Sequence, residues 1–226
     1  MRPNSRSALV VGSSGLVGGF CLQFLLDDVS YNKVIVLVRK RVPLKHAKLE
    51  QHVIDFGQLN NFSHLIKSDD VFCCLGTTTK RAGSQAEYEK VDYTYPFELA
   101  KIASTNGTEQ FLIVTSIGAD PASSFFYLRT KGRIEEAINS LSFRTVYIFR
   151  PSMLVGRREE FRWQDYLVPP LLKIAALGMV GRWRKYRAIE GKAVAYSMVE
   201  SAKMNLEGIH VYESDQIQSM YDQGIR

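Results

Sequence analysis

The 226-residue chain has few cysteines and histidines, and their positions argue against disulfide and metal sites. The three cysteines, Cys21, Cys73 and Cys74, form no Cys-x-x-Cys pair and are flanked by apolar residues. Such a set is typical of reduced thiols in a protein core and favours the cytoplasm over an oxidising compartment. The four histidines are scattered along the sequence, so no metal site is expected.

The chain also lacks a long uninterrupted apolar run. Residues 166–180 contain Pro169, Pro170 and Lys173, and the stretch is too short and too interrupted to span a bilayer. Residues 1–7 are polar, without the apolar centre of a secretory signal. We therefore expect no transmembrane segment and a single packed core, for which 46% hydrophobic content is sufficient.

The net charge of +6 implies an anionic partner. Basic residues cluster within 39–41, 157–162 and 182–187 rather than along one helix, and no nucleic-acid-binding motif accompanies them. We therefore expect a multiply charged cofactor and no nucleic acid. A protein partner or a homo-oligomer stays open.

Apolar runs and helical patterns alternate along the chain. Strands are predicted at residues 8–11, 34–38, 52–56, 71–75, 111–114, 145–149 and 209–213. Helices are predicted at residues 16–26, 59–66, 87–105, 127–140, 165–177 and 193–206. The alternation predicts an α/β fold, a Rossmann-type doubly wound parallel sheet of about seven strands. We expect one domain over residues 1–226, in which residues 156–208 form a small C-terminal lid at the carboxyl ends of the strands. An alternative for the apolar and basic part of this segment is contact with an anionic membrane surface.

A glycine-rich turn joins the first predicted strand to the first helix, with Gly12, Gly15 and Gly18 at intervals of three. The first permits a tight turn, the second leaves room for a diphosphate against the backbone, and the third allows close helix packing. The N–H groups and the dipole of this helix start can hold phosphate groups. The flanking strand and helix favour dinucleotide binding over an ordinary turn.

Three consecutive cations, Arg39, Lys40 and Arg41, follow the second predicted strand. A protein that prefers NAD usually has an acidic residue there, which accepts hydrogen bonds from the ribose 2′-hydroxyl. An acidic side chain would repel a 2′-phosphate, whereas an arginine binds it with several charged donors. The triplet predicts NADP(H) as the cofactor, with a solvated basic loop as the alternative.

Tyr127 and Lys131 are four residues apart in a predicted helix, which places them on one face. A phenol has an ordinary pKa of about 10, and a nearby ammonium favours its ionised form, so the pair suits acid–base chemistry. The fifth predicted strand ends at Thr115 and Ser116, either of which could bind a substrate carbonyl while the tyrosine supplies a proton. A solvated helix face with a plain turn is the alternative.

Further strings carry a resemblance to a known family: Cys73-Cys74-Leu75-Gly76-Thr77-Thr78, Val91-Asp92, Gly118-Ala119-Asp120, Tyr127-Leu128-x-x-Lys131-Gly132 and Phe149-Arg150-Pro151. With the glycine triplet, the chain resembles an atypical or extended short-chain dehydrogenase/reductase. Over residues 8–200 it is similar more narrowly to the Tat-interacting-protein oxidoreductases, a group of NADPH-binding proteins. The string that begins at Cys73 is more specific than the glycine triplet.

The resemblance implies a set of cofactor contacts. The diphosphate would be surrounded by Ser14, Gly15, Leu16 and Val17. The 2′-phosphate would lie against Arg39 and Lys40, and the adenosine ribose beside Leu75 and Gly76. The nicotinamide end would be contacted by Tyr127, Lys131 and Leu154, with Arg162 as a further cofactor contact.

The resemblance implies an NADPH-dependent oxidoreductase that transfers hydride to a small-molecule carbonyl substrate. One departure is in the fourth helix, where extended reductases usually have a proton-relaying asparagine and this chain has Val91-Asp92-Tyr93. This departure leaves open an NADPH-binding regulator without significant turnover. A nucleotide-sugar epimerase or dehydratase is a third alternative, although about fifty residues after Arg157 leave little room for a nucleotide-sugar domain.

Overall fold

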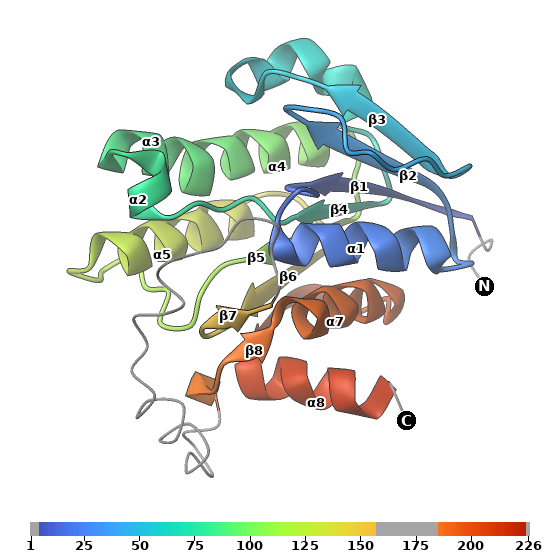
Figure 1. Ribbon diagram of the computed structural model, residues 1–226. Coiled ribbons are helices and arrows are strands. Elements are labelled where there is room, and N and C mark those ends of the chain that lie inside the picture. Colours follow the sequence, from blue (N-terminus) through green and yellow to red (C-terminus); the bar gives the residue numbers. More distant parts are fainter. Residues whose placement is uncertain (1–4, 157–184, 225–226) are drawn as a thin grey trace.

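The computed structural model describes residues 5–156 and 185–224, and within them seven parallel strands form the central sheet (Figure 1). In sequence order these strands are β1 (Arg6–Val11), β2 (Tyr31–Val38), β3 (Leu49–Val53), β4 (Asp70–Cys73), β5 (Gln110–Val114), β6 (Thr145–Arg150) and β9 (Gly208–Glu213). A second, two-stranded parallel sheet pairs β7 (Leu154–Val155) with β8 (Ile189–Glu190).

Helices connect the strands and cover the sheet. The α-helices are α1 (Leu16–Asp27), α2 (Thr79–Ala82), α3 (Gln85–Glu89), α4 (Tyr95–Thr105), α5 (Phe126–Asn139), α7 (Gly191–Lys203) and α8 (Ser214–Gly224). A 3₁₀ segment spans Phe56–Leu65, and a π-helical turn spans Lys90–Thr94.

The order of the strands is β3-β2-β1-β4-β5-β6-β9, so the chain moves outwards from β1 first in one direction and then in the other. β1 pairs with β2 on one side and with β4 on the other. In such sheets ligands bind at the reversal point, outside the carboxyl ends of the strands. The predicted doubly wound α/β fold is therefore confirmed, with its expected binding edge between β1 and β4.

Two apolar cores hold the layers together, one on each face of the sheet. Ala8 and Val10 of β1 face the core shared with α1, α7 and α8, whereas Leu9 and Val11 face the core shared with α4 and α5. All four side chains are fully buried. A run of apolar residues without alternation is what a parallel strand with two covered faces requires.

Three local features differ from the sequence expectations. β3 ends at Val53 rather than at residue 56, because the Asp55 carboxylate accepts a hydrogen bond from the Gly57 N–H at 2.8 Å and caps the 3₁₀ segment. The single helix expected over residues 87–105 is divided by the π-helical turn. α8 follows β9 directly and is not among the predicted helices.

The second half of the expected lid lies elsewhere than predicted. α7, predicted to cover the carboxyl ends of the strands, packs instead against α1 in the same layer, with Val194 and Met198 fully buried (Figure 1). Nine of its thirteen residues are buried, which makes it part of the core. The helix expected at residues 165–177 and most of the proposed membrane-surface segment lie outside the described residues. Among the helices that are described, none is long and apolar enough to cross a membrane.

Candidate active site

The glycine turn between β1 and α1 brings three backbone segments into close contact. Gly12 has φ of +81°, and a Cβ there would overlap the carbonyl oxygen of Cys74 at the end of β4. A Cβ on Gly18 would overlap the carbonyl oxygen of Gly12. The turn and the close helix packing expected of Gly12 and Gly18 are therefore both present.

Within the described residues, no side chain caps the start of α1. Gly15 is the N-cap residue and provides no side-chain cap, so the first N–H groups of the helix are left for other acceptors. Beside them, the buried hydroxyl of Ser13 has no hydrogen-bond partner within the described part of the chain. An anion with several oxygen acceptors, such as a diphosphate, fits this donor set.

The segment after β6 packs against the same helix start. Leu16 lies against Gly156 and Gly191, where a Cβ on either glycine would overlap its side chain. The pairing of β7 with β8 holds this segment, and Leu154 of β7 packs on the core under α1. Leu154 is thereby held near the glycine turn.

Arg39 and Lys40 lie directly after β2 and are exposed. No residue in the described ranges forms an ion pair with either side chain. β2 neighbours β1, so both cations follow the strand next to the glycine turn. Their charge is available to an anionic ligand.

The carboxyl end of β4 is fastened by a buried carboxylate. The Cys74 N–H donates to the Val11 carbonyl at 2.9 Å, which holds Leu75 and Gly76 beside the glycine turn. Three residues later, the Thr77 N–H donates to Asp92 Oδ2 at 2.8 Å. Asp92 comes from the π-helical turn and is 1% exposed.

The same carboxylate pairs with Lys131 of α5. Asp92 Oδ1 lies 2.7 Å from Lys131 Nζ, and both side chains are almost completely buried. Burial alone would lower the pKa of Lys131, but its electrostatic interactions, first with the Asp92 carboxylate and then with Tyr127, outweigh burial and give a net rise. Lys131 is therefore a buried cation at neutral pH.

Tyr127 lies in the first turn of α5, and its side chain is 40% exposed. Its ring centroid is 6.1 Å from that of the buried Tyr88, on α3. α5 is held close to the loop after β5, because a Cβ on Gly132 would overlap the backbone of Asp120 and Pro121. This contact explains in physical terms why residue 132 is a glycine.

The two hydroxyls at the end of β5 differ in their partners. Thr115 Oγ1 donates to Glu135 Oε1 at 2.6 Å, and Glu135 in turn binds Arg150 of β6. Ser116 is buried, and within the described residues its Oγ has only a 3.3 Å hydrogen bond to the neighbouring Ile117 carbonyl. The Thr115 hydroxyl is engaged in a short hydrogen bond, whereas the hydrogen bond of the Ser116 hydroxyl is long and weak.

Three side chains of this region were not among the sequence-predicted site residues: Ser13, Tyr88 and Asp92. Asp92 was noted as a departure from the family pattern, but its pairing with Lys131 joins segments far apart in the sequence. Ser13 lies inside the glycine turn, and its position there was the available signal. Arg162, an expected cofactor contact, lies outside the residues that the structure describes.

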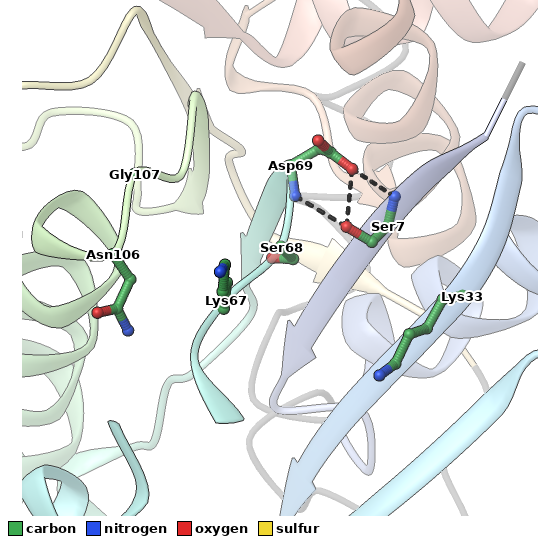
Figure 2. Close-up of a pocket in the computed structure, with 7 residues that line it drawn as sticks. All are labelled: Ser7, Lys33, Lys67, Ser68, Asp69, Asn106 and Gly107. Carbon is green, nitrogen blue, oxygen red and sulfur yellow. Dashed lines mark hydrogen bonds between the residues drawn. The ribbon is translucent and has the colours of Figure 1, made fainter. Parts of the chain in front are cut away.

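A hollow of about 310 Å³ lies at the opposite end of the sheet, beside the amino ends of β1, β4 and β5 (Figure 2). Several of its polar groups already have partners. Ser7 donates to Asp69 Oδ2 from both its N–H and its hydroxyl at 2.7 Å, and Lys33 pairs with Glu50 at 2.6 Å. The remaining cation, Lys67, is exposed to solvent. This hollow is separate from the candidate site.

Several solved structures with the same fold are complexes with NAD. The Bordetella bronchiseptica enzyme WbmH in complex with NAD+ has a TM-score of 0.70 at 15% identity, covering 96% of this chain and 80% of that chain. UDP-N-acetylglucosamine 4-epimerase from Methanobrevibacter ruminantium has a TM-score of 0.68 at 14% identity, covering 96% of this chain and 80% of its own. At these identities the likeness shows the Rossmann fold alone.

Relatives found by sequence have a higher identity to this chain than these structures do. Protein HTATIP2 of Rattus norvegicus is 33% identical over 167 residues, which are 72% of this chain and 69% of the relative. Protein FMP52-1, mitochondrial, of Scheffersomyces stipitis is 36% identical over 158 residues, 68% of this chain and 69% of the relative. A family model described as HIM1 matches residues 34–181.

The names of these relatives correct the expected cytoplasmic location. FMP52 proteins of Scheffersomyces stipitis, Meyerozyma guilliermondii and Candida albicans are all named mitochondrial. Free cysteines argue only against an oxidising compartment and do not distinguish the cytoplasm from other reducing ones. With the HIM1 match and relatives at 33% and 36% identity, the chain belongs to the HIM1 family, an atypical short-chain dehydrogenase/reductase family.

Proposed function

We propose that the protein is an NADP(H)-dependent oxidoreductase that reduces a carbonyl group of a small molecule. The observation that carries this proposal is the buried ammonium of Lys131, one helical turn from Tyr127 on α5. Buried charges of this kind are concentrated at catalytic sites, because they shift the protonation of their neighbours. The reductase proposal accounts for the cation and the tyrosine together.

The cofactor is proposed to lie across the carboxyl ends of β1, β2 and β4. Its diphosphate would accept hydrogen bonds at the α1 start, from residues 13–17, where the unpartnered Ser13 hydroxyl supports the assignment. Its 2′-phosphate would bind Arg39 and Lys40. Leu75 and Gly76 would lie beside the adenosine ribose, and Leu154 near the carboxamide. When bound, NADPH supplies the hydride.

The proposed acid–base chemistry uses groups of α5 and β5. Tyr127 donates a proton to the carbonyl oxygen, and the hydroxyl of Ser116 donates a hydrogen bond to the same oxygen. Thr115 is the weaker candidate, because its hydroxyl already donates to Glu135. Lys131 stabilises the phenolate that remains on Tyr127 after the transfer.

The experiment is a screen of NADPH oxidation against a panel of aldehydes and ketones. With a substrate in hand, Ser116→Ala should lower kcat roughly 100-fold, as the loss of one oxyanion donor does. Thr115→Val is the matched comparison. The fraction of this variant that folds should retain most of the kcat of the unchanged protein. If the protein binds NADPH but none of the carbonyl compounds in the panel supports its oxidation, the reductase proposal is wrong and a regulatory role replaces it.

We also propose a mitochondrial location, on the strength of the FMP52 relatives that are named mitochondrial. Fractionation of the cells that make the protein, followed by immunoblotting, tests this. Enrichment with a mitochondrial matrix marker supports the proposal, and enrichment with a cytosolic marker contradicts it.

A further inference from the structure

β9 forms one edge of the central sheet, and among the described strands it pairs with β6 alone. The Gly208 N–H donates to the Arg144 carbonyl at 3.0 Å, so Gly208 directs its backbone groups towards β6. The backbone groups of successive strand residues point to opposite sides of the strand. The N–H and C=O groups of Ile209 and Val211 therefore point outwards, away from the sheet.

The carboxyl end of this outer edge is closed by the chain itself. The Glu213 N–H donates to Gln216 Oε1 at 3.0 Å, which agrees with an outward direction for the odd-numbered residues of β9. The N–H and C=O groups of Ile209 and Val211 have no hydrogen-bond partner within the described part of the chain. Free backbone groups at a sheet edge are a template for another strand.

The two edges of the sheet differ in their side chains. On β3, at the opposite edge, Glu50 pairs with Lys33 at 2.6 Å, and charges of this kind discourage pairing with another strand. Residues 208–212 of β9 include no lysine, arginine, aspartate or glutamate. Four of the exposed large apolar side chains lie in or just before β9: Met204, Leu206, Ile209 and Val211. This concentration of apolar side chains marks an interaction surface.

We propose that a second copy of this chain binds the β9 edge, with the two β9 strands antiparallel about a two-fold axis at His210. In this register Ile209 of each copy lies opposite Val211 of the other. Opposed antiparallel residues with facing backbone groups exchange both of their hydrogen bonds, so all the free groups of both residues are satisfied. The same pairing places apolar side chains directly opposite each other. The interface is self-complementary, as a two-fold dimer requires.

The neighbouring registers that keep the side chains on their own faces satisfy fewer groups. With the axis at Val211, Ile209 would lie opposite Glu213, whose N–H already has a partner. With the axis at Ile209, Val211 would lie opposite Glu207, before the strand begins. The axis at His210 is therefore the register that pairs both free residues.

The charges at the two ends of β9 are complementary in this arrangement. Glu207 is exposed and forms no ion pair with a described residue. At the other end of the strand, Glu213 pairs with Lys185 at 2.9 Å, and both side chains are partly exposed. Antiparallel pairing brings Glu207 of one copy near Lys185 of the other, and the symmetry repeats this contact. The charges thus favour a second copy as the occupant of the edge.

Sedimentation of the full chain over a range of concentrations tests the surface. We expect a species of twice the 25.6 kDa chain mass. Val211→Lys should weaken the dimer at least about tenfold, because a charge at an edge opposes pairing. Val53→Lys is the matched control, since Val53 is 52% exposed on the opposite edge strand, and it should leave the dimer unchanged. An unchanged chain that stays monomeric, or equal effects of the two substitutions, would overturn the proposal.

Cysteine cross-linking tests the register and does not depend on the folding of Val211→Lys. His210→Cys places the two cysteines opposite each other in a non-hydrogen-bonded pair, with Cα atoms about 4.5 Å apart, which a disulfide can bridge. Mild oxidation should give a linked dimer on a non-reducing gel, measured against the unchanged chain. Ile209→Cys and Val211→Cys should give much less, because their cysteines are offset along the strands. No linked dimer from His210→Cys, or more from either other variant, would overturn the proposed pairing.

Discussion

Both carboxylate oxygens of Glu135 bind the guanidinium of Arg150, at the end of β6. The Arg150 Nε atom lies 3.0 Å and 3.2 Å from the two oxygens. Glu135 also accepts a hydrogen bond from the hydroxyl of Thr115. Glu135 is four residues after Lys131 on α5, so this contact fixes the helix that carries Tyr127 against the ends of β5 and β6. Arg150, in the string Phe149-Arg150-Pro151, therefore has a positioning role.

The first prediction follows from this pair. Glu135 is buried, so Glu135→Gln should lower the free energy of unfolding by about 2–3 kcal/mol, because a charged hydrogen-bonded partner is lost. Urea unfolding measures this value. Glu136→Gln, at the adjacent exposed position, should change it by less than about 0.5 kcal/mol. Equal effects of the two substitutions would show that the ion pair contributes nothing specific.

The sequence predicted the features that depend on neighbouring residues. The roles of Gly12 and Gly18 and the alternation of strands and helices follow from local rules, and the structure confirms them. The pairings of Asp92 with Lys131 and of Glu135 with Arg150 depend on how distant segments meet, which no spacing rule gives. α7 shows the same limit, since its pattern predicts a helix but not whether that helix covers the site or the core.

The second prediction concerns cofactor choice. Because Arg39 and Lys40 are exposed cations after β2, NADPH should bind more tightly than NADH, as measured by titration calorimetry. Arg39→Ala should weaken NADPH binding by roughly 1.5–3 kcal/mol and NADH binding far less. Lys45→Ala removes an equal charge from a nearby exposed position and should leave both affinities almost unchanged. Equal affinities of the unchanged protein for the two nucleotides would contradict the NADP(H) assignment.

The third prediction concerns the glycine turn. Gly15→Val should abolish NADPH binding in a folded protein, because a branched side chain would occupy the space of the diphosphate. A Cβ there lies 3.1 Å from the Gly12 carbonyl oxygen, so a small loss of stability is expected as well. Circular dichroism reports the fold and fluorescence titration reports binding. An unchanged spectrum with undiminished affinity would place the diphosphate elsewhere.

The fourth prediction is a pH dependence from Asp70, at the amino end of β4. Burial raises the pKa of Asp70 to about 6, although Arg6 and Tyr31 oppose the shift. Since the folded-state pKa exceeds the ordinary value, this contribution to stability is complete below about pH 4 and is lost as pH rises through 6. The loss amounts to at most about 3 kcal/mol.

A carbon-13 titration of the aspartate carboxyl groups checks this directly. Asp28 is the internal control, because its hydrogen bonds from Lys203 and Ser30 outweigh the effect of burial and lower its pKa. Asp70 should titrate near pH 6 and Asp28 below its ordinary value. An Asp70 midpoint below pH 4 would mean that its donors, Arg6 and Tyr31 among them, overcome the cost of burial.

The most direct test of the reductase account is the kinetics of Tyr127→Phe with a carbonyl substrate found by the NADPH screen. The substitution removes the proton donor, so turnover should be lost while NADPH affinity falls only by about one hydrogen bond, about 1 kcal/mol. Lys131→Ala should weaken both turnover and NADPH binding. A Tyr127→Phe protein that reduces the carbonyl at the rate of the unchanged protein would contradict the account.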